Sequence, residues 1–193
     1  MRGLRLQQML TEASLKPEDR GLVIVYTGEG KGKTTAAMGL ALRAAGYDRR
    51  VKVIQFVKIW FTGEKGGFEH LPNVDFVQAG KGFYKILNDK LPEQDHLAAA
   101  SAAADLALAA LTGDEYGVVV LDEIIGTVHG GLLPVERLNE LLDARPLAVD
   151  LVLTGRHADL VPGLLGRADL VTEMVKIKHP YDSGILARKT IDY

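Results

Sequence analysis

Residues 23–35 decide the fold of this chain, and they read Val-Ile-Val-Tyr-Thr-Gly-Glu-Gly-Lys-Gly-Lys-Thr-Thr. An apolar run typical of a strand enters a glycine-rich turn, and the turn opens onto a helix that we expect to begin near Lys33. The glycines at 28, 30 and 32 let the backbone wrap closely around an anion and point N–H groups toward it. The stretch therefore predicts a strand, a phosphate-binding loop and a helix, in that order.

Two side chains of this loop have the chemistry that a bound nucleotide needs. Lys33 adds a full positive charge to the partial charge of the helix N-terminus, and Thr34 is placed to offer its hydroxyl to a phosphate-bound Mg²⁺. The usual pattern G-x-x-x-x-G-K-[ST] has a glycine where this chain has Thr27. An ordinary glycine-rich turn is the alternative, but the strand, the Gly-Lys-Thr-Thr and the helix together favour a nucleotide site. The predicted nucleotide-binding residues of the loop are Gly28, Glu29, Gly30, Lys31, Gly32, Lys33, Thr34 and Thr35.

The composition narrows the class of protein. A chain of 193 residues suits one domain, and its formal net charge of -2 gives no reason to expect nucleic acid or an acidic membrane as partner. The absence of cysteine excludes disulfides, thiolate nucleophiles and cysteine-ligated metal centres. Residues 1–20 lack the apolar core of a signal peptide, and the longest apolar run, 97–111, is shorter than the ~20 residues that span a bilayer. We therefore expect a cytoplasmic protein.

Apolar strand-like runs alternate with helical patterns along the rest of the chain. Strands are expected at 22–26, 51–57, 74–77, 117–123, 148–153 and 168–175, with helices at 33–45, 92–111, 133–142 and 158–165 and a loop at 59–67. Such alternation predicts one three-layer α/β domain of the P-loop NTPase-like (RecA-like) class, with a mostly parallel sheet, at residues 21–193. Residues 1–20 are expected to form an amphipathic N-terminal arm, although a frayed terminus fits their leucine pattern equally well.

A second motif ends the strand expected at 117–123. Four apolar residues precede Asp122 and Glu123, which is typical of the Walker B strand whose carboxylate reaches the nucleotide's Mg²⁺. A pair of acids that only caps the next helix is the alternative, and the phosphate-binding loop in the same chain favours the metal site. Aromatic residues at 60, 61, 83 and 84 lie in loops that follow strands. In open α/β sheets such loops line the ligand crevice, so these aromatics are consistent with a large flat ligand or with simple loop anchoring.

The chain resembles the bacterial ATP:corrinoid adenosyltransferases of the CobA/BtuR/CobO type from about residue 21 to its C-terminus. The resemblance begins with the shifted glycine loop, because this family has threonine at position 27. Further matching segments are Val-Ile-Gln-Phe-Val-Lys (53–58), Gly-Phe (82–83), Leu-Asp-Glu (121–123), Leu-Thr-Gly-Arg (153–156), Ala-Asp-Leu-Val-Thr-Glu-Met (168–174), Lys-His (178–179) and Ile-Asp-Tyr (191–193). The order and spacing of these segments make the resemblance specific.

The resemblance implies an activity and its substrates. Members of this family transfer the 5′-deoxyadenosyl group of ATP to the cobalt of a reduced corrinoid and release triphosphate, with Mg²⁺ or Mn²⁺ as the metal. It also implies that the nucleotide lies reversed in the loop, that the protein is a homodimer, and that the N-terminal arm reaches over an active site. A reductant protein such as a flavodoxin is the further partner that this activity suggests.

The resemblance implies roles for particular residues as well. Lys33, Phe83 and Glu123 are predicted to be catalytic, Arg43 to contact the nucleotide, and Phe83 with Tyr84 to contact the corrinoid. The predicted metal ligands are Thr34, Asp122 and Glu123. The chain departs from the family pattern at Gly-Phe-Tyr-Lys (82–85), where many relatives carry Gly-Phe-Thr-Trp, and at Ile-Trp-Phe (59–61). The second aromatic contact to the corrin and the preferred corrinoid are therefore left open.

Two other functions fit parts of the sequence. A P-loop ATPase or kinase would use the same loop and acids, but no arginine-rich lid segment and no Asn-Lys-x-Asp motif is present. A non-catalytic corrinoid carrier is the other alternative, and the D-x-H-x-x-G motif of one common kind of carrier is absent.

Overall fold

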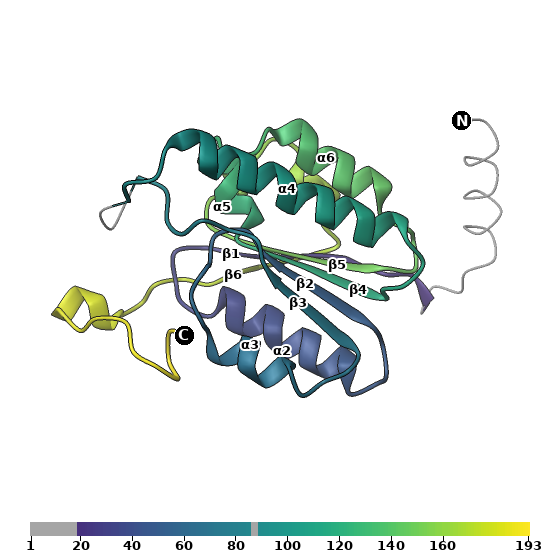
Figure 1. Cartoon of the computed structure of the whole chain (residues 1–193), viewed down its shortest axis with the longest axis horizontal. Helices are drawn as coiled ribbons and strands as arrows, with labels where there is room; N and C mark the ends of the chain where they lie inside the picture. Colours follow the sequence, from purple (N-terminus) through teal and green to yellow (C-terminus); the bar gives the residue numbers. More distant parts are fainter. Residues whose placement is uncertain (1–18, 86–88) are drawn as a thin grey trace.

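The computed structural model describes residues 19–85 and 89–193 (Figure 1). The predicted N-terminal arm at 1–20 lies almost wholly outside these residues. Six strands form one sheet in the order β3-β2-β4-β5-β1-β6, and every neighbouring pair is parallel. The strands are β1 (Val23–Thr27), β2 (Val51–Gln55), β3 (Val74–Gln78), β4 (Val118–Asp122), β5 (Asp150–Thr154) and β6 (Leu170–Glu173).

Helices cover both faces of the sheet and complete three layers (Figure 1). On one face lie α2 (Lys33–Ala45) and α3 (Gly63–Phe68), and on the other lie α4 (Glu93–Thr112), α5 (Ile124–His129) and α6 (Val135–Ala144). The buried apolar side chains form two clusters, one on each face. The predicted three-layer α/β fold with a parallel sheet is therefore confirmed.

Alanine at helical spacing lets the two longest helices lie close to the sheet. In α2, Ala37 and Ala41 are fully buried against strands, and in α4 the same is true of Ala103, Ala104 and Ala107. Small side chains bring the helix axis near the strands without loss of packing, and alanine also has the highest helix propensity. No helix in the described ranges has the length and apolar character that crossing a bilayer requires.

Several predicted element boundaries are wrong. Helix α3 begins inside the loop expected at 59–67, and the side chain of Thr62 caps its N-terminus. The helix expected at 158–165 is a 3-10 turn (Ala158–Leu160) followed by the short helix α7 (Leu164–Arg167). The strand expected at 168–175 spans only 170–173, and α5 had no predicted counterpart.

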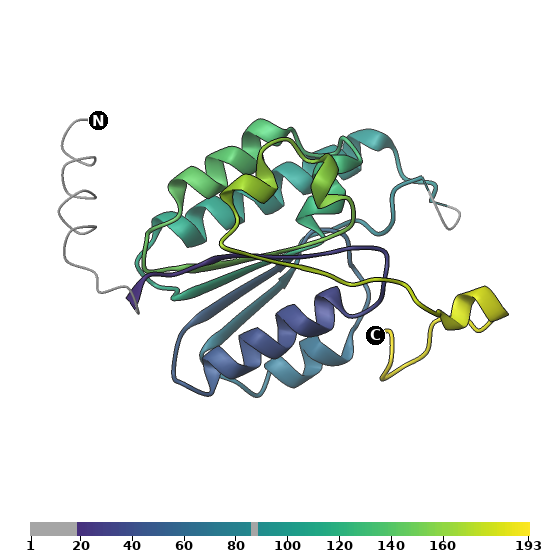
Figure 2. The same ribbon diagram turned by 180° about the vertical axis from the view of Figure 1, so that it is seen from behind.

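Because all six strands are parallel, the loops that follow them meet at one edge of the sheet. Figure 2 shows the far side, where β6 lies at the end of the sheet and the chain runs on to the 3-10 helix Pro180–Ser183. The segment after that helix returns toward the loop that follows β1, and its last residues lie over that loop. The candidate site is built at this edge.

Candidate active site

The glycine-rich loop after β1 is held against the end of β6. A Cβ on Gly28, which has a φ of 99°, would lie 2.5 Å from the carbonyl oxygen of Met174, and a Cβ on Gly30 would lie 2.6 Å from the same atom. The Gly30 N–H also donates to that oxygen at 2.5 Å. Gly32 has a φ of 118° and precedes the first residue of α2. The glycines are required here by close backbone approach and by left-handed geometry.

Lys33 is buried at the start of α2, 8% exposed, and its ammonium group bonds to the backbone of the glycine-rich loop. Its Nζ donates to the carbonyl oxygens of Gly28 at 2.7 Å and Gly30 at 2.9 Å. Burial lowers the pKa of Lys33 from its ordinary value, and the nearby Glu123 carboxylate opposes that shift. The amine therefore lies beside the loop amides, where an incoming phosphate competes with two carbonyl oxygens for its protons.

Asp122, at the end of β4, is fully buried and accepts four hydrogen bonds. One carboxylate oxygen, Oδ1, accepts from the hydroxyls of Thr34 at 2.8 Å and Thr154 at 2.7 Å. The other, Oδ2, accepts from Gln55 Nε2 at 2.9 Å and from Lys58 Nζ at 3.3 Å. The donors from Thr154, Gln55 and Lys58 fix the Asp122 carboxylate, and the carboxylate in turn fixes the Thr34 hydroxyl at the mouth of the phosphate-binding loop.

Glu123 follows Asp122 in a left-handed conformation with a φ of 66°. Its backbone N–H donates to the Thr154 hydroxyl at 2.9 Å, and its side chain lines the same cavity as Lys33 and Thr34. Burial, and then the charge of Asp122, raise the pKa of Glu123 above its ordinary value. The turn at Glu123 directs the second carboxylate into the cavity while the first stays buried.

The oxygen groups present fit a magnesium ion that is bound mainly through substrate phosphates. The Thr34 hydroxyl and the Glu123 carboxylate both line the cavity and are oxygen ligands of the kind Mg²⁺ prefers. Both oxygens of Asp122 already accept hydrogen bonds, so this residue suits an outer position. Among the described residues, no three His, Cys, Asp or Glu side chains group closely enough to hold a metal by themselves.

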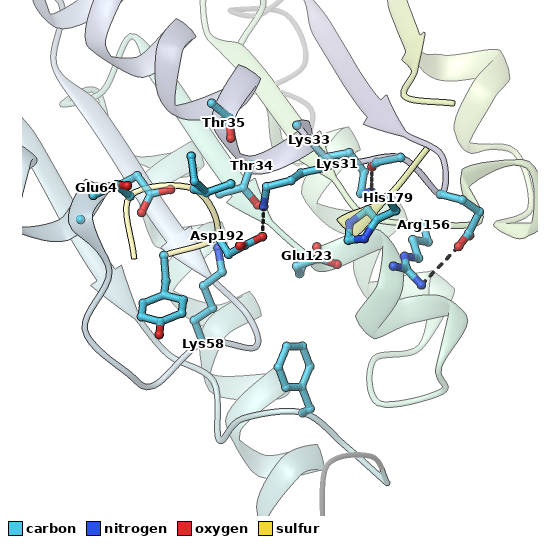
Figure 3. A pocket seen from close by; sticks show the side chains of 18 residues that line it. Lys31, Lys33, Thr34, Thr35, Lys58, Glu64, Glu123, Arg156, His179 and Asp192 are labelled. Carbon is cyan, nitrogen blue, oxygen red and sulfur yellow. Dashed lines mark hydrogen bonds and ion pairs between the residues drawn. The ribbon is translucent and has the colours of Figure 1, made fainter. Parts of the chain in front are cut away.

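Two cavities open side by side at this edge of the sheet. The phosphate cavity, about 600 Å³, is lined by residues 29–35 of the loop together with side chains from other loops (Figure 3). The aromatic cavity, about 770 Å³, is lined by Trp60, Phe61, Phe83 and Tyr193 among others. The rings of Trp60 and Phe83 pack with their centroids 5.2 Å apart. Five residues line both cavities and form a shared wall: Lys31, Lys58, Phe83, Asp192 and Tyr193.

Each cation of the phosphate cavity already has a partner in the protein. Lys31 Nζ lies 2.6 Å from Asp192 Oδ1, which brings the C-terminal segment over the loop. Arg156, which follows β5, pairs with Glu29 at 3.2 Å. Figure 3 shows these pairs at opposite ends of the cavity. Binding of a polyphosphate therefore requires exchange of protein partners for phosphate oxygens.

Most of the predicted site residues come together here. Residues 29–35, Phe83 and Glu123 line the phosphate cavity, and Asp122 lies directly behind it. Arg43 lies in the last turn of α2, exposed and outside both cavities. The ring of Tyr84 packs on His96 of α4, 5.3 Å between centroids, and Tyr84 lines neither cavity. The predicted roles of Arg43 and Tyr84 remain predictions without a contact in this chain.

Several lining residues had no predicted role. They are Lys58, Glu64, Arg156, His179 and the segment 190–193. The segments that carried the resemblance include Lys58, Arg156, His179 and 191–193, so their signal was present in the sequence. Their place in the cavity depends on how distant loops meet, which local patterns do not report.

The fold and the loop define a P-loop nucleotide-binding protein whose phosphate cavity adjoins an aromatic one. A model of the family described as ATP:corrinoid adenosyltransferase BtuR/CobO/CobP matches residues 19–193. The chain is 37% identical over 178 residues to a corrinoid adenosyltransferase of Pseudomonas aeruginosa, covering 91% of this chain and 85% of that protein. It is 39% identical over 179 residues to the corrinoid adenosyltransferase CobA of Salmonella typhimurium, covering 91% and 87%. The chain belongs to the ATP:corrinoid adenosyltransferase family.

Proposed function

We propose that this chain transfers the 5′-deoxyadenosyl group of ATP to the cobalt of a reduced corrinoid and releases triphosphate. The observation that carries the proposal is the shared wall between a phosphate cavity and an aromatic cavity. A triphosphate in the first and a flat corrin in the second would bring C5′ and cobalt together at that wall. Membership of the family supports the same substrates.

The chemistry requires little covalent work from the protein. Co(I) is a strong nucleophile, so the chain has to orient the two substrates and stabilise the charge that develops on the leaving triphosphate. Lys33 and the loop amides would bind the phosphates. Thr34 and Glu123 would hold Mg²⁺ (or Mn²⁺), with Asp122 fixing Thr34, and the metal would neutralise phosphate charge. The side chains of the aromatic cavity would exclude water and so protect the reactive cobalt.

Phe83 has a further role in this proposal. Phe83 lines both cavities and is 40% exposed as a residue, so it is available to a corrin. We infer that the ring presses on the lower face of the corrin and displaces the axial ligand from Co(II). Loss of an axial donor lowers the energy of the orbital that accepts the electron, so a weak reductant such as a flavodoxin would suffice. A cytoplasmic homodimer, with the N-terminal arm over an active site, completes the proposal.

The experiment that tests the proposal supplies MgATP and chemically reduced cob(I)alamin to the purified protein. The corrin absorbance is followed while the phosphate products are separated. Adenosylcorrinoid and triphosphate are expected. ADP with phosphate would support a P-loop ATPase or kinase in its place, and binding without turnover would support a corrinoid carrier.

A further inference from the structure

Lys58 follows β2 and is the least exposed lysine of the wall that the two cavities share. Its side chain is 16% exposed, whereas that of Lys31 is 39% exposed. Figure 3 shows Lys58, Glu123 and Asp192 converging on the phosphate cavity from different parts of the chain. In the proposed reaction, on which this inference rests, the bond that breaks joins C5′ to an oxygen of the triphosphate. That bond must lie where the two cavities meet, beside the shared wall.

The only partner of the Lys58 ammonium among the described residues is Asp122 Oδ2, at 3.3 Å. This contact is longer than the other three that Asp122 accepts, which lie between 2.7 and 2.9 Å. Asp122 would keep its bonds from Thr34, Thr154 and Gln55 if Lys58 turned away. Lys58 can therefore exchange its partner without leaving a buried carboxylate unsatisfied.

Two other cations of the cavity, Lys33 and Lys31, make shorter contacts to protein oxygens than Lys58 does. Lys33 donates to two carbonyl oxygens at 2.7 and 2.9 Å, and Lys31 pairs with Asp192 at 2.6 Å. Arg156 pairs with Glu29 and lines only the phosphate cavity. Lys58 alone combines a place in the shared wall, a largely buried stem and a weak contact to its present partner.

We propose that Lys58 is a catalytic residue that donates a hydrogen bond to the leaving oxygen of triphosphate. The cobalt supplies the electron pair of the new Co–C5′ bond. The C5′–O bond breaks, and its electron pair stays on the triphosphate oxygen, where the Lys58 ammonium stabilises the added charge. No proton has to be transferred in this step. Lys33 and the loop would stabilise the remaining phosphates, and Lys58 the oxygen at which the bond breaks.

The competing explanation is that Lys58 serves only to neutralise Asp122. In that case its loss would lower the stability of the fold and leave the affinity for polyphosphate unchanged. The two explanations are separated by measuring binding of inorganic triphosphate without metal, since this readout needs neither corrinoid nor turnover. Lys52→Met is the matched control, because Lys52 lies on β2, stacks over the Tyr116 ring and lines neither cavity.

The first experiment titrates inorganic triphosphate in the presence of EDTA by calorimetry, with thermal unfolding of each variant measured beside it. Lys58→Met should bind at least about tenfold more weakly than the wild type, as expected for one lost charge-assisted contact. Lys58→Arg and Lys52→Met should bind within about threefold. Where Lys58→Met fails to fold, Lys58→Gln, which keeps a donor for Asp122, replaces it. Unchanged triphosphate affinity in a folded Lys58→Met or Lys58→Gln protein would overturn the proposal.

The second experiment measures a single turnover with preformed cob(I)alamin and saturating MgATP. Lys58→Met should slow the chemical step by about 10²–10³, the usual loss for one group that stabilises developing charge, and Lys58→Arg should recover part of it. A single-turnover rate of Lys58→Met within twofold of the wild-type rate would contradict the role of Lys58. A wild-type protein that forms no adenosylcorrinoid would refute the proposed function, and the triphosphate titration would still decide whether Lys58 contacts the anion.

Discussion

Replacing Thr154 by valine tests how the acidic end of β4 is held in place. Thr154 is fully buried, and its hydroxyl both donates to Asp122 Oδ1 at 2.7 Å and accepts from the Glu123 backbone N–H at 2.9 Å. Valine has nearly the same shape and neither function. Thr154→Val therefore removes two hydrogen bonds from the candidate site while the packing of β5 is preserved.

The expected loss of stability follows from the hydrogen-bond partners of the Thr154 hydroxyl. A hydrogen bond to a charged group contributes about 1.5–3 kcal/mol and a neutral one about 1 kcal/mol, and the Glu123 N–H is left without a partner. We expect the free energy of unfolding to fall by about 3 kcal/mol. For a domain of this size, that change lowers Tm by about 6–12 °C.

Urea unfolding of Thr154→Val and the wild type, fitted with a common m value, measures the difference. Thr154→Ser keeps the hydroxyl and should lose only about 1 kcal/mol, for one methyl group. Thr112→Val is the second control, because the exposed Thr112 hydroxyl donates to the Leu108 carbonyl oxygen within α4; it should change stability by less than about 0.5 kcal/mol. A Thr154→Val protein as stable as Thr112→Val would refute the hydrogen-bond network described around Asp122.

Three further predictions concern the site itself. Lys33→Ala and Thr34→Ala should each lower kcat by about 10²–10³ with little change in the far-ultraviolet circular dichroism spectrum, because each removes a group aimed at phosphate or metal; near-normal kcat in Lys33→Ala would contradict the phosphate assignment. Phe83→Ala should lose most activity when the assay starts from Co(II) with a biological reductant and much less with preformed Co(I), and equal losses would make Phe83 a loop anchor only. Tyr84→Phe should leave the KM for corrinoid unchanged, because Tyr84 lines neither cavity. Its stability should be equal or higher, because the buried Tyr84 hydroxyl has no hydrogen-bond partner among the described residues. A raised KM would instead support a corrin contact.

The parts of the fold that the sequence predicted best are those with local signals. The helix expected at 33–45 has those bounds in the structure, because glycine residues stand at both ends and alanines line one face. Strand β4, which ends in Asp122, was equally clear, since buried parallel strands are continuously apolar. The class of fold followed from the alternation of such segments.

Short elements gave no such signal. Helix α5 (Ile124–His129) contains β-branched residues and a glycine, and it forms because the turn at Glu123 starts it and the core buries Ile124 and Ile125. Helix α3 is only six residues long and contains three glycines. Tertiary packing therefore decides both helices, and local propensity opposes them.

The composition of the site was predictable only where a motif carried it. The phosphate loop and the two acids have patterns of their own, whereas Lys58 and Asp192 reach the cavity from distant segments. Tyr84 shows that adjacency in sequence does not give two side chains the same surroundings, and its predicted corrin contact stays a prediction. Its ring packs on His96 of α4, while the Phe83 ring lines both cavities.

The central claim is that the two adjoining cavities perform one reaction between ATP and a corrinoid. Its most direct test is the product stoichiometry of the wild-type protein with MgATP and preformed cob(I)alamin, with phosphorus NMR for the phosphates and absorbance for the corrin. The account predicts one triphosphate for each adenosylcorrinoid formed, and no phosphate product when corrinoid is omitted. Formation of ADP at a rate that does not depend on corrinoid would contradict it.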